Sequence, residues 1–471
     1  MKLHPHRPTA SERLPLYRLA GEGVRSDAIR PVGIVGAGVS GFIAAVTLRY
    51  SGLAAEDVVL FDETPAFLAE WSRGADAIQQ RFMRSESEGH FYATDFPGFA
   101  LLHAVHHASL LPLLRSAVNR YNPTVDDILA HGRALAAHYR IADAVQPARI
   151  VRVKREYEPI PHFALYDAGS RLRGRARNVL LALGHGELQW PAACIDPAVR
   201  VELEGILCHA YGPKTYSGRQ VLIIGSGMSA ATEWTNVLRA GGSVIAVRRA
   251  RNLVEQPLSA PRCSFTRPWL DQYHALDATG RAEVLAGLAR GSYPRSGSWK
   301  RVLDDGETSG RLRWRVGEVT EIRRAGAGAA VVIHDPEHGG METLQADMVI
   351  AATGFASGWR KYDVLRALVS EYGLQTQDSH LMLADDCSVP GLSTDRSVLS
   401  VTGPAARWAF PAADSFAGMK YAARRFTRQA LDEPRSGMRG LSAWWDMVRG
   451  GWPYGKDPTE TEGGSAACAS P

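Results

Sequence analysis

Two stretches decide the fold: GIVGAGVSG at residues 33–41 and LIIGSGMSA at residues 222–230. Each is an apolar run that breaks into a glycine-rich turn and continues with helical patterning. A buried strand, a tight turn and a helix in this order form the first half of a βαβ unit. Because the pattern occurs twice and no shorter repeat is present, we predict an α/β fold built from two Rossmann-like units.

The glycine spacing assigns a role to each position of the turns. The complete G-x-G-x-x-G pattern is formed by Gly36, Gly38 and Gly41, and the variant with Ala in third place by Gly225, Gly227 and Ala230. The first glycine permits the turn, the second lets the backbone approach a pyrophosphate, and the third lets the helix pack closely. The pyrophosphate would then face free N–H groups where the helix begins. We therefore predict a dinucleotide at each turn and add three residues at the helix starts: Ser40, Met228 and Ser229.

The ends of the second strands distinguish the two ligands. The first, VVLFDE, ends in Asp62 and Glu63, where a carboxylate would accept hydrogen bonds from a ribose and repel a 2′-phosphate. The second continues as VRRAR, in which Arg248, Arg249 and Arg251 would pair with a 2′-phosphate. We predict FAD at the first turn and NADPH at the second, with an exposed basic loop as the alternative for the arginines.

Composition bounds the remaining possibilities. The net charge of +5 arises from 54 basic and 49 acidic residues scattered over 471, which does not favour nucleic-acid binding. Five cysteines without a CxxC pair fit a reducing compartment, and no apolar run suits a signal peptide or membrane helix. We expect a cytoplasmic protein without a membrane partner. His103 and His107 have the i, i+4 spacing of a metal pair, but a helix face is the simpler interpretation, so we predict no metal.

The order of elements divides the chain. We predict an N-terminal arm at 1–30, an FAD-binding domain at 31–200 and 341–435, an NADPH-binding domain at 201–340, and a C-terminal segment at 436–471 whose tail is disordered. Two strand-plus-glycine motifs, LALGHG and IAATGF, mark crossovers between the domains. The second motif adds Thr353 and Gly354 to the predicted cofactor site. Helical patterning covers 101–121, 126–139, 268–289 and 412–431.

With both units in one chain, this order resembles the class B flavoprotein monooxygenases, which include flavin-containing monooxygenases, Baeyer–Villiger enzymes and amino-acid N-hydroxylases. The stretch LEGILCH at 203–209 matches the FxGxxxH motif of the first group at Gly205 and His209, with Leu in place of Phe. The resemblance implies that NADPH reduces FAD and that O2 then gives a C4a-hydroperoxyflavin. A nucleophilic nitrogen or sulfur of a small-molecule substrate would take one oxygen atom.

A finer likeness lies in IQQRFMRSE at 78–86, which is similar to the MQxSFLKDL segment beside the flavin of ornithine and lysine N-hydroxylases. Gln79 matches its Gln, Arg84 falls on a Lys that holds the substrate carboxylate, and Ser85 replaces its Asp. The resemblance therefore implies Arg84, Ser85 and Gln79 as catalytic-site residues, with Gln79 also near the cofactor. The stretch GSYPRSG at 291–297 corresponds to a TNY-like segment, without its Asn.

We thus predict N-hydroxylation of the amine of a small, carboxylate-bearing substrate. The alternative is a flavin-containing or Baeyer–Villiger monooxygenase acting on an uncharged amine, sulfide or ketone, supported by the likeness of YATDFPGF at 92–99 to an FSDFP segment. A disulfide reductase shares the two-nucleotide plan but requires a CxxC or CxxxxC pair, which this chain lacks. A nucleotide-binding scaffold without turnover and a homo-oligomer are left open.

Overall fold

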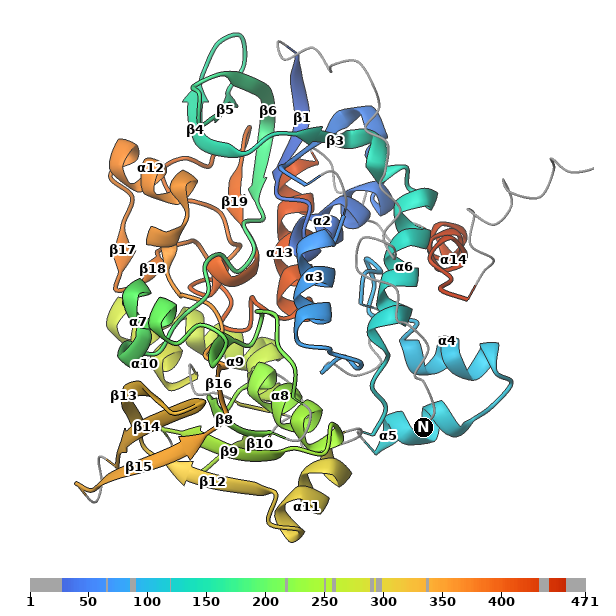
Figure 1. The fold of residues 1–471 in the computed structure, drawn as a ribbon. Coiled ribbons are helices and arrows are strands. Elements are labelled where there is room, and N and C mark those ends of the chain that lie inside the picture. Colours follow the sequence, from blue (N-terminus) through green and yellow to red (C-terminus); the bar gives the residue numbers. More distant parts are fainter. Residues whose placement is uncertain are drawn as a thin grey trace, which may run out of the picture.

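The computed structural model describes residues 28–64, 67–84, 90–118, 120–216, 219–249, 251–255, 260–288, 292–293, 299–335, 339–431 and 440–454. Two large sheets organise them, one of seven strands and one of five. The first lies at the top of Figure 1 and the second at the bottom. The predicted α/β class with two Rossmann-like units is confirmed.

The first sheet is built around the strand of the first glycine turn. Its strands in spatial order are β3 (Val145–Pro147), β2 (Val58–Asp62), β1 (Ile29–Val35), β6 (Leu172–Leu181), β5 (His162–Asp167) and β4 (Ile150–Glu156), and β19 (Leu399–Val401) also pairs with β6. Parallel pairing joins β1, β2, β3, β6 and β19. β5 pairs antiparallel with the first half of β6, and β4 pairs antiparallel with β5. The carboxyl ends of β1, β6 and β19 therefore meet at one edge of the sheet.

The second sheet repeats this plan with parallel strands throughout. In spatial order they are β12 (Leu312–Val316), β9 (Ser243–Arg248), β8 (Gln220–Ile224), β16 (Met348–Ala351) and β7 (Leu207–His209). An antiparallel sheet of β13 (Glu318–Ala325), β14 (Gly328–His334) and β15 (Met341–Ala346) accompanies it. Short pairs are formed by β10 (Val254–Glu255) with β11 (Ser292–Tyr293), and by β17 (Thr376–Gln377) with β18 (His380–Leu381).

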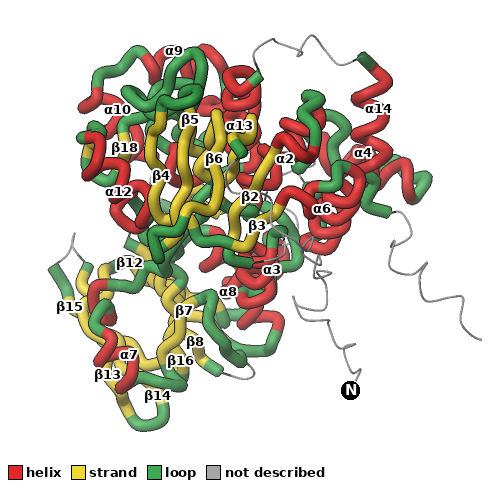
Figure 2. The backbone as a smooth tube through the Cα atoms, turned by 90° about the horizontal axis from the view of Figure 1, so that it is seen from above, coloured by secondary structure: helices red, strands yellow, loops and turns green. Residues whose placement is uncertain are grey.

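Helices cover the sheets, as Figure 2 shows from above. Their bounds are α2 (Val39–Tyr50), α3 (Ala69–Ala77), α4 (Phe99–His106), α5 (Leu111–Ala117), α6 (Val125–His138), α7 (Pro197–Glu202), α8 (Met228–Arg239), α9 (Arg267–His274), α10 (Ala278–Leu288), α11 (Lys300–Thr308), α12 (Asp363–Tyr372), α13 (Phe416–Ala430) and α14 (Leu441–Gly450). The part of the chain that the structure describes contains no helix long and apolar enough to cross a membrane.

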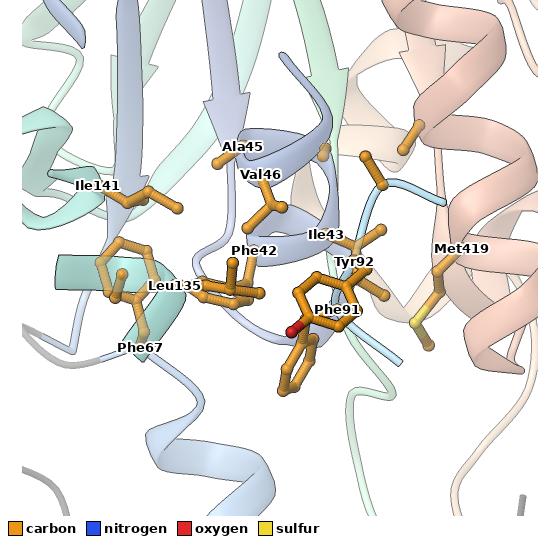
Figure 3. Close-up of a cluster of buried hydrophobic side chains, with 14 of the residues drawn as sticks. Phe42, Ile43, Ala45, Val46, Phe67, Phe91, Tyr92, Leu135, Ile141 and Met419 are labelled. Carbon is orange, nitrogen blue, oxygen red and sulfur yellow. The ribbon is translucent and has the colours of Figure 1, made fainter. Parts of the chain in front are cut away.

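The helix that follows the first glycine turn is buried from Ser40 to Leu48. Its Phe42 contacts Phe67 and Phe91, with ring centroids 5.4 and 5.0 Å apart, and Met419 of α13 belongs to the same cluster (Figure 3). A helix buried on nearly all sides is held by packing on every face. The start of α2, where the turn lies, is thereby fixed within the first unit.

Two predicted helices are each divided into two shorter helices, and one predicted domain boundary lies at a different residue. The patterning at 101–121 corresponds to α4 and α5, and that at 268–289 to α9 and α10. The predicted start of the second FAD-domain segment at residue 341 is too early, because β16 pairs with β8 and β7 and so extends the second sheet to Ala351. Strand pairing across the sheet, rather than local patterning, determines this boundary.

The helical pair α9–α10 also departs from the predicted division. It falls within the predicted NADPH domain at 201–340, yet Leu270 and Leu285 share a core with Leu365 of the first unit. Tyr273 Oη donates a hydrogen bond of 2.8 Å to the backbone oxygen of Trp408. This segment therefore reaches across to the first unit. The predicted disordered tail lies outside the described residues.

Candidate active site

The three glycines of the first turn meet three different environments. Gly36 has φ +102°, and a Cβ added there would lie 2.1 Å from the carbonyl oxygen of Ala182. A Cβ on Gly41 would lie 1.9 Å from the oxygen of Gly36, whereas one on Gly38 would meet nothing within 4 Å. The outer two glycines are thus required by close backbone packing, and the middle one faces open space as a pyrophosphate requires.

Asp62 closes the first turn from the end of β2. Its Oδ2 accepts a hydrogen bond of 2.7 Å from the backbone N–H of Ala37, and its Oδ1 accepts one of 2.8 Å from Thr64. Lone pairs remain on both oxygens for a ribose. Glu63 instead lies on the surface, 3.4 Å from Arg149. Of the two predicted carboxylates, Asp62 is the one that belongs to the turn.

A third segment reaches this turn, which the sequence analysis missed. Thr402 at the end of β19 donates its backbone N–H to the oxygen of Leu181 at 2.9 Å. Gly403 follows with φ +70°, and a Cβ there would lie 2.8 Å from Oγ of Ser40. The sequence SVTGP at 400–404 is a further strand ending in glycine, so the same pattern was the available signal.

The second turn repeats the geometry of the first. Gly225 has φ +136°, and a Cβ there would lie 2.4 Å from the oxygen of Ala352, the counterpart of Ala182. A Cβ on Gly227 would meet nothing within 4 Å, and Ala230 is completely buried against the sheet. Met228 and Ser229 begin α8, as predicted. Both turns therefore present an open middle glycine at a helix N-terminus.

Arg248, at the end of β9, lies beside the second turn. Its guanidinium carbon is 5.3 Å from the centre of the Trp314 ring, and its buried Nε has no hydrogen-bond partner. Burial lowers the pKa of Arg248 from its ordinary value. Arg249 is exposed, and Arg251 is engaged with Asp335 at 3.7 Å. The ring of Trp314 thus orients Arg248, whose Nε–H group can still donate a hydrogen bond.

Replacing Arg248 by Ala is expected to reduce the preference for NADPH over NADH at least about tenfold, because a charge-assisted hydrogen bond contributes about 1.5–3 kcal/mol. The measurement is the ratio of apparent affinities of the two nucleotides. Arg251→Ala is the matched control and should change the ratio less than about threefold, since its partner is Asp335. An unchanged ratio in both Arg248→Ala and Arg249→Ala would contradict the assignment.

The two crossovers between the units lie side by side. Thr353 Oγ1 donates a hydrogen bond to the backbone oxygen of Gln189, and Gln189 donates its N–H to the oxygen of Gly354 at 2.9 Å. His209 is buried beside them, with Nε2 3.1 Å from the same Gln189 oxygen, and burial lowers the pKa of His209 to about 4. A neutral, hydrogen-bonded ring fits a structural role at the junction. Thr353 and Gly354 therefore form part of the connection between the units.

A cavity of about 240 Å³ opens where these crossovers meet. His185 stacks on Phe355, with ring centroids 4.8 Å apart, and Asp414 and Lys361 also face the cavity. Although the ring of His185 is exposed at the rim, desolvation by the surrounding protein lowers its pKa, while the carboxylate of Asp414 acts in the opposite direction. Lys361 donates hydrogen bonds to the oxygens of His185 and Ala356, and burial lowers its pKa to about 8. The cavity thus combines a carboxylate, an amine and an imidazole.

Arg84 connects the two segments that the resemblance singled out. Its Nη1 donates to the backbone oxygen of Ser292 at 2.9 Å, and its Nη2 donates to Ser292 Oγ at 2.7 Å. Burial lowers the pKa of Arg84 to about 10, and Asp414 partly offsets this effect. Arg84 is therefore still a cation at neutral pH. Because Asp414 also acts on His185, Arg84 and the cavity share one electrostatic environment.

Of the other two predicted catalytic-site residues, the structure describes only Gln79. Gln79 is exposed, has φ +48°, and follows the end of α3. It lies near Thr235 and Asn236 of α8, at the boundary between the units. Ser85 lies outside the described residues. The structure thus places Gln79 beside the second unit and Arg84 beside Ser292.

The histidine pair at 103 and 107 belongs to an aromatic cluster. The two rings are 4.3 Å apart, and His103 Nδ1 lies 3.3 Å from the hydroxyl of Tyr121. Tyr454 packs against the same histidines. Within the described ranges, no group of three or more His, Cys, Asp or Glu side chains is placed to hold a metal ion.

A larger cavity of about 730 Å³ lies between α10, α12 and residues 382–392. Its wall is mainly apolar, and its charged residues, Arg281 and Asp385, bind each other at 3.0 Å. No residue of either glycine turn lines it. We therefore place the candidate active site at the crossovers and the turns, where the polar groups converge.

This architecture defines a class by its fold, in which two Rossmann-like units are joined by paired crossovers. No protein-family model and no curated protein sequence matches the chain. Solved structures do match. The FAD-bound cadaverine monooxygenase DfoA of Erwinia amylovora is 14% identical, with a TM-score of 0.66 over 87% of this chain and 96% of that one.

Two further structures have the same fold. The ornithine N-hydroxylase KtzI of Kutzneria sp. 744 is 16% identical, with a TM-score of 0.63 over 86% of this chain and 99% of that one. The L-lysine 6-monooxygenase of Pseudomonas syringae is 14% identical, with a TM-score of 0.61 over 85% and 99%. The predicted resemblance is thereby confirmed at the level of the fold.

Proposed function

We propose that the protein is an FAD- and NADPH-dependent monooxygenase that N-hydroxylates the amine of a small molecule. The observation that carries the proposal is the pair of glycine turns, each with an open middle glycine at a helix start. The likeness to amine hydroxylases supports it: the neighbours act on cadaverine, ornithine and lysine. All three substrates are small aliphatic amines.

In this proposal each residue of the turns has a defined task. The backbone at Gly38 and the start of α2 hold the FAD pyrophosphate, with Asp62 on the ribose. The backbone at Gly227 and the start of α8 hold that of NADPH, with Arg248 on the 2′-phosphate. When bound, the flavin supplies the redox chemistry and activates O2, while the protein orients the reactants and excludes water.

Arg84 is the proposed binding group for a substrate carboxylate. A guanidinium presents two parallel donors that suit a carboxylate, and at neutral pH Arg84 remains charged. Ser292, already bonded to Arg84, adds a hydroxyl at the same place. The amine has to lose its proton before it can act as a nucleophile, and His185, which lines the same cavity as Asp414, is a candidate acceptor.

The test is a substrate screen on the purified protein. We expect a yellow protein with bound FAD whose NADPH oxidation is stimulated by an amino acid such as ornithine or lysine, with a hydroxylamine as product. Cadaverine, which has the amine without the carboxylate, should be turned over less efficiently by at least about tenfold, the effect of one lost charged contact. A colourless protein that cannot be reconstituted with FAD would refute the proposal.

The screen also decides the substrate class. If an uncharged amine, sulfide or ketone is oxygenated while carboxylate-bearing amines are not, then the carboxylate assignment is wrong. A flavin-containing or Baeyer–Villiger monooxygenase would then be the better description. Product identification by mass spectrometry distinguishes the hydroxylamine from a sulfoxide or an ester.

A further inference from the structure

A buried ion pair joins the two units away from the glycine turns and the cavity. Nζ of Lys214 lies 3.1 Å from Oε1 of Glu233, and the two side chains are 1% and 0% exposed. Burying two charges costs several kcal/mol, so a pair of this kind is a weak source of stability. Its position between the two units suggests another role.

The ammonium group of Lys214 holds backbone from both units. It donates to the oxygens of Ala77 and Gly212 at 3.0 Å each, and to that of Ala210. Ala77 is the last residue of α3 in the first unit, whereas the other two follow β7 in the second. Because an ammonium has three N–H donors, these three carbonyls occupy all of them.

Glu233 faces this ammonium; burial raises the pKa of its carboxyl group to about 7, although Lys214 acts in the opposite direction. Its Oε1 has no hydrogen-bond partner and faces Lys214 as an ion pair, while its Oε2 accepts a hydrogen bond of 2.7 Å from the hydroxyl of Tyr216. About one helical turn further along α8, Asn236 donates a hydrogen bond of 2.7 Å from Nδ2 to the backbone oxygen of Ile78. The side chains of Lys214 and Asn236 thus bind the second unit to the carboxyl end of α3.

Each of the two helices, α8 and α3, connects the ion pair with one of the glycine turns. Glu233 lies six residues beyond Gly227 on α8, which is about 9 Å along a rigid helix. At the other end of α3, Leu68 donates its N–H to the oxygen of Ala37 in the first turn at 3.5 Å. The chain after Ala77 continues to Gln79 and Arg84. The ion pair is therefore connected through α8 and α3 to both turns.

We propose that Lys214 and Glu233 are positioning residues that hold α8 against the end of α3 and so set the separation of the two nucleotides. This inference rests on the proposed function, because it concerns hydride transfer from NADPH to FAD, which leaves NADP⁺ and reduced FAD. Such a transfer requires the reacting atoms to lie about 3–3.5 Å apart, and a displacement of about 1 Å lowers the rate about 100-fold.

The test is the double variant Lys214→Met/Glu233→Met, which removes both charges and leaves neither buried alone. Anaerobic rapid mixing with NADPH gives the limiting rate of flavin reduction and the apparent dissociation constant separately. We expect the limiting rate to fall at least about tenfold, while FAD content stays complete and the dissociation constant changes less than about threefold. A limiting rate within about twofold of the unmodified protein would overturn the proposal.

The matched control is Lys420→Met, which removes a lysine that is 3% exposed and lies 3.3 Å from Asp95 within the first unit. It should lower the unfolding temperature without changing the limiting rate. An equal loss of rate in this control would show that the pair matters only through general stability. If the unmodified protein binds no FAD or is not reduced by NADPH, the proposed function fails instead, and the two failures are thereby distinguished.

If the double variant does not retain FAD, Lys214→Arg provides the test. It keeps the buried positive charge, but a planar guanidinium does not reproduce the three donors of an ammonium. The same fall in the limiting rate is expected, and an unchanged rate would refute the proposal.

Discussion

Replacing Gly38 by Val is expected to give a folded protein that binds no FAD. A Cβ at Gly38 meets no protein atom within 4 Å, so the new side chain starts in open space in the unliganded fold. It does fill the space that the pyrophosphate requires. Two lost charge-assisted hydrogen bonds of about 1.5–3 kcal/mol each correspond to at least about 100-fold weaker binding. Flavin absorbance after reconstitution and far-UV circular dichroism measure the two effects.

Gly36→Ala is the informative comparison. There φ is +102°, and the Cβ would lie 2.1 Å from the oxygen of Ala182, so the substitution strains the fold itself. We expect a lower unfolding temperature in Gly36→Ala but not in Gly38→Val. Normal FAD binding by Gly38→Val would exclude the first turn as the flavin site.

Replacing Arg84 by Met is expected to abolish product formation while NADPH still reduces the flavin. The side chain donates hydrogen bonds to the backbone oxygen and to Oγ of Ser292. Losing a charged contact to the substrate corresponds to an increase in KM of about 10- to 150-fold. NADPH consumption should continue and yield peroxide instead of hydroxylamine, because the substrate is no longer held. Both products are quantified in the same assay.

Two companion variants make this result specific. Arg84→Lys keeps the charge and should recover part of the product, whereas Arg81→Met removes an exposed arginine from the same segment and should leave turnover unchanged. If Arg84→Met instead loses FAD or is reduced slowly by NADPH, then Arg84 serves a cofactor rather than the substrate.

The sequence by itself was sufficient for the fold class and for the positions of the two glycine turns. A glycine turn between a buried strand and a helix depends on residues only a few positions apart, so Gly36, Gly38 and Gly41 can be recognised locally. The same locality gave Met228 and Ser229 correctly as the start of α8. Asp62 was predictable for this reason too, since it ends the strand that pairs with that of the turn.

Features that depend on contacts between distant segments could not be predicted. Strand pairing carries the second sheet to Ala351, and packing places α9–α10 on the first unit, although neither leaves a local pattern. Gly403 was missed because its glycine matters only through its approach to Ser40, far away in the chain.

The clearest contrast is between the turns and the ion pair. Spacing along the chain determined where each glycine turn lies, because the turn, the helix start and the strand end are neighbours in sequence. Only the tertiary structure shows that Lys214 reaches Ala77 and Glu233 at once, because a lysine and a glutamate in a sequence carry no sign of burial or of a shared partner. Charge burial is a property of the packed interior, and it is decided by all the segments that exclude water from the pair.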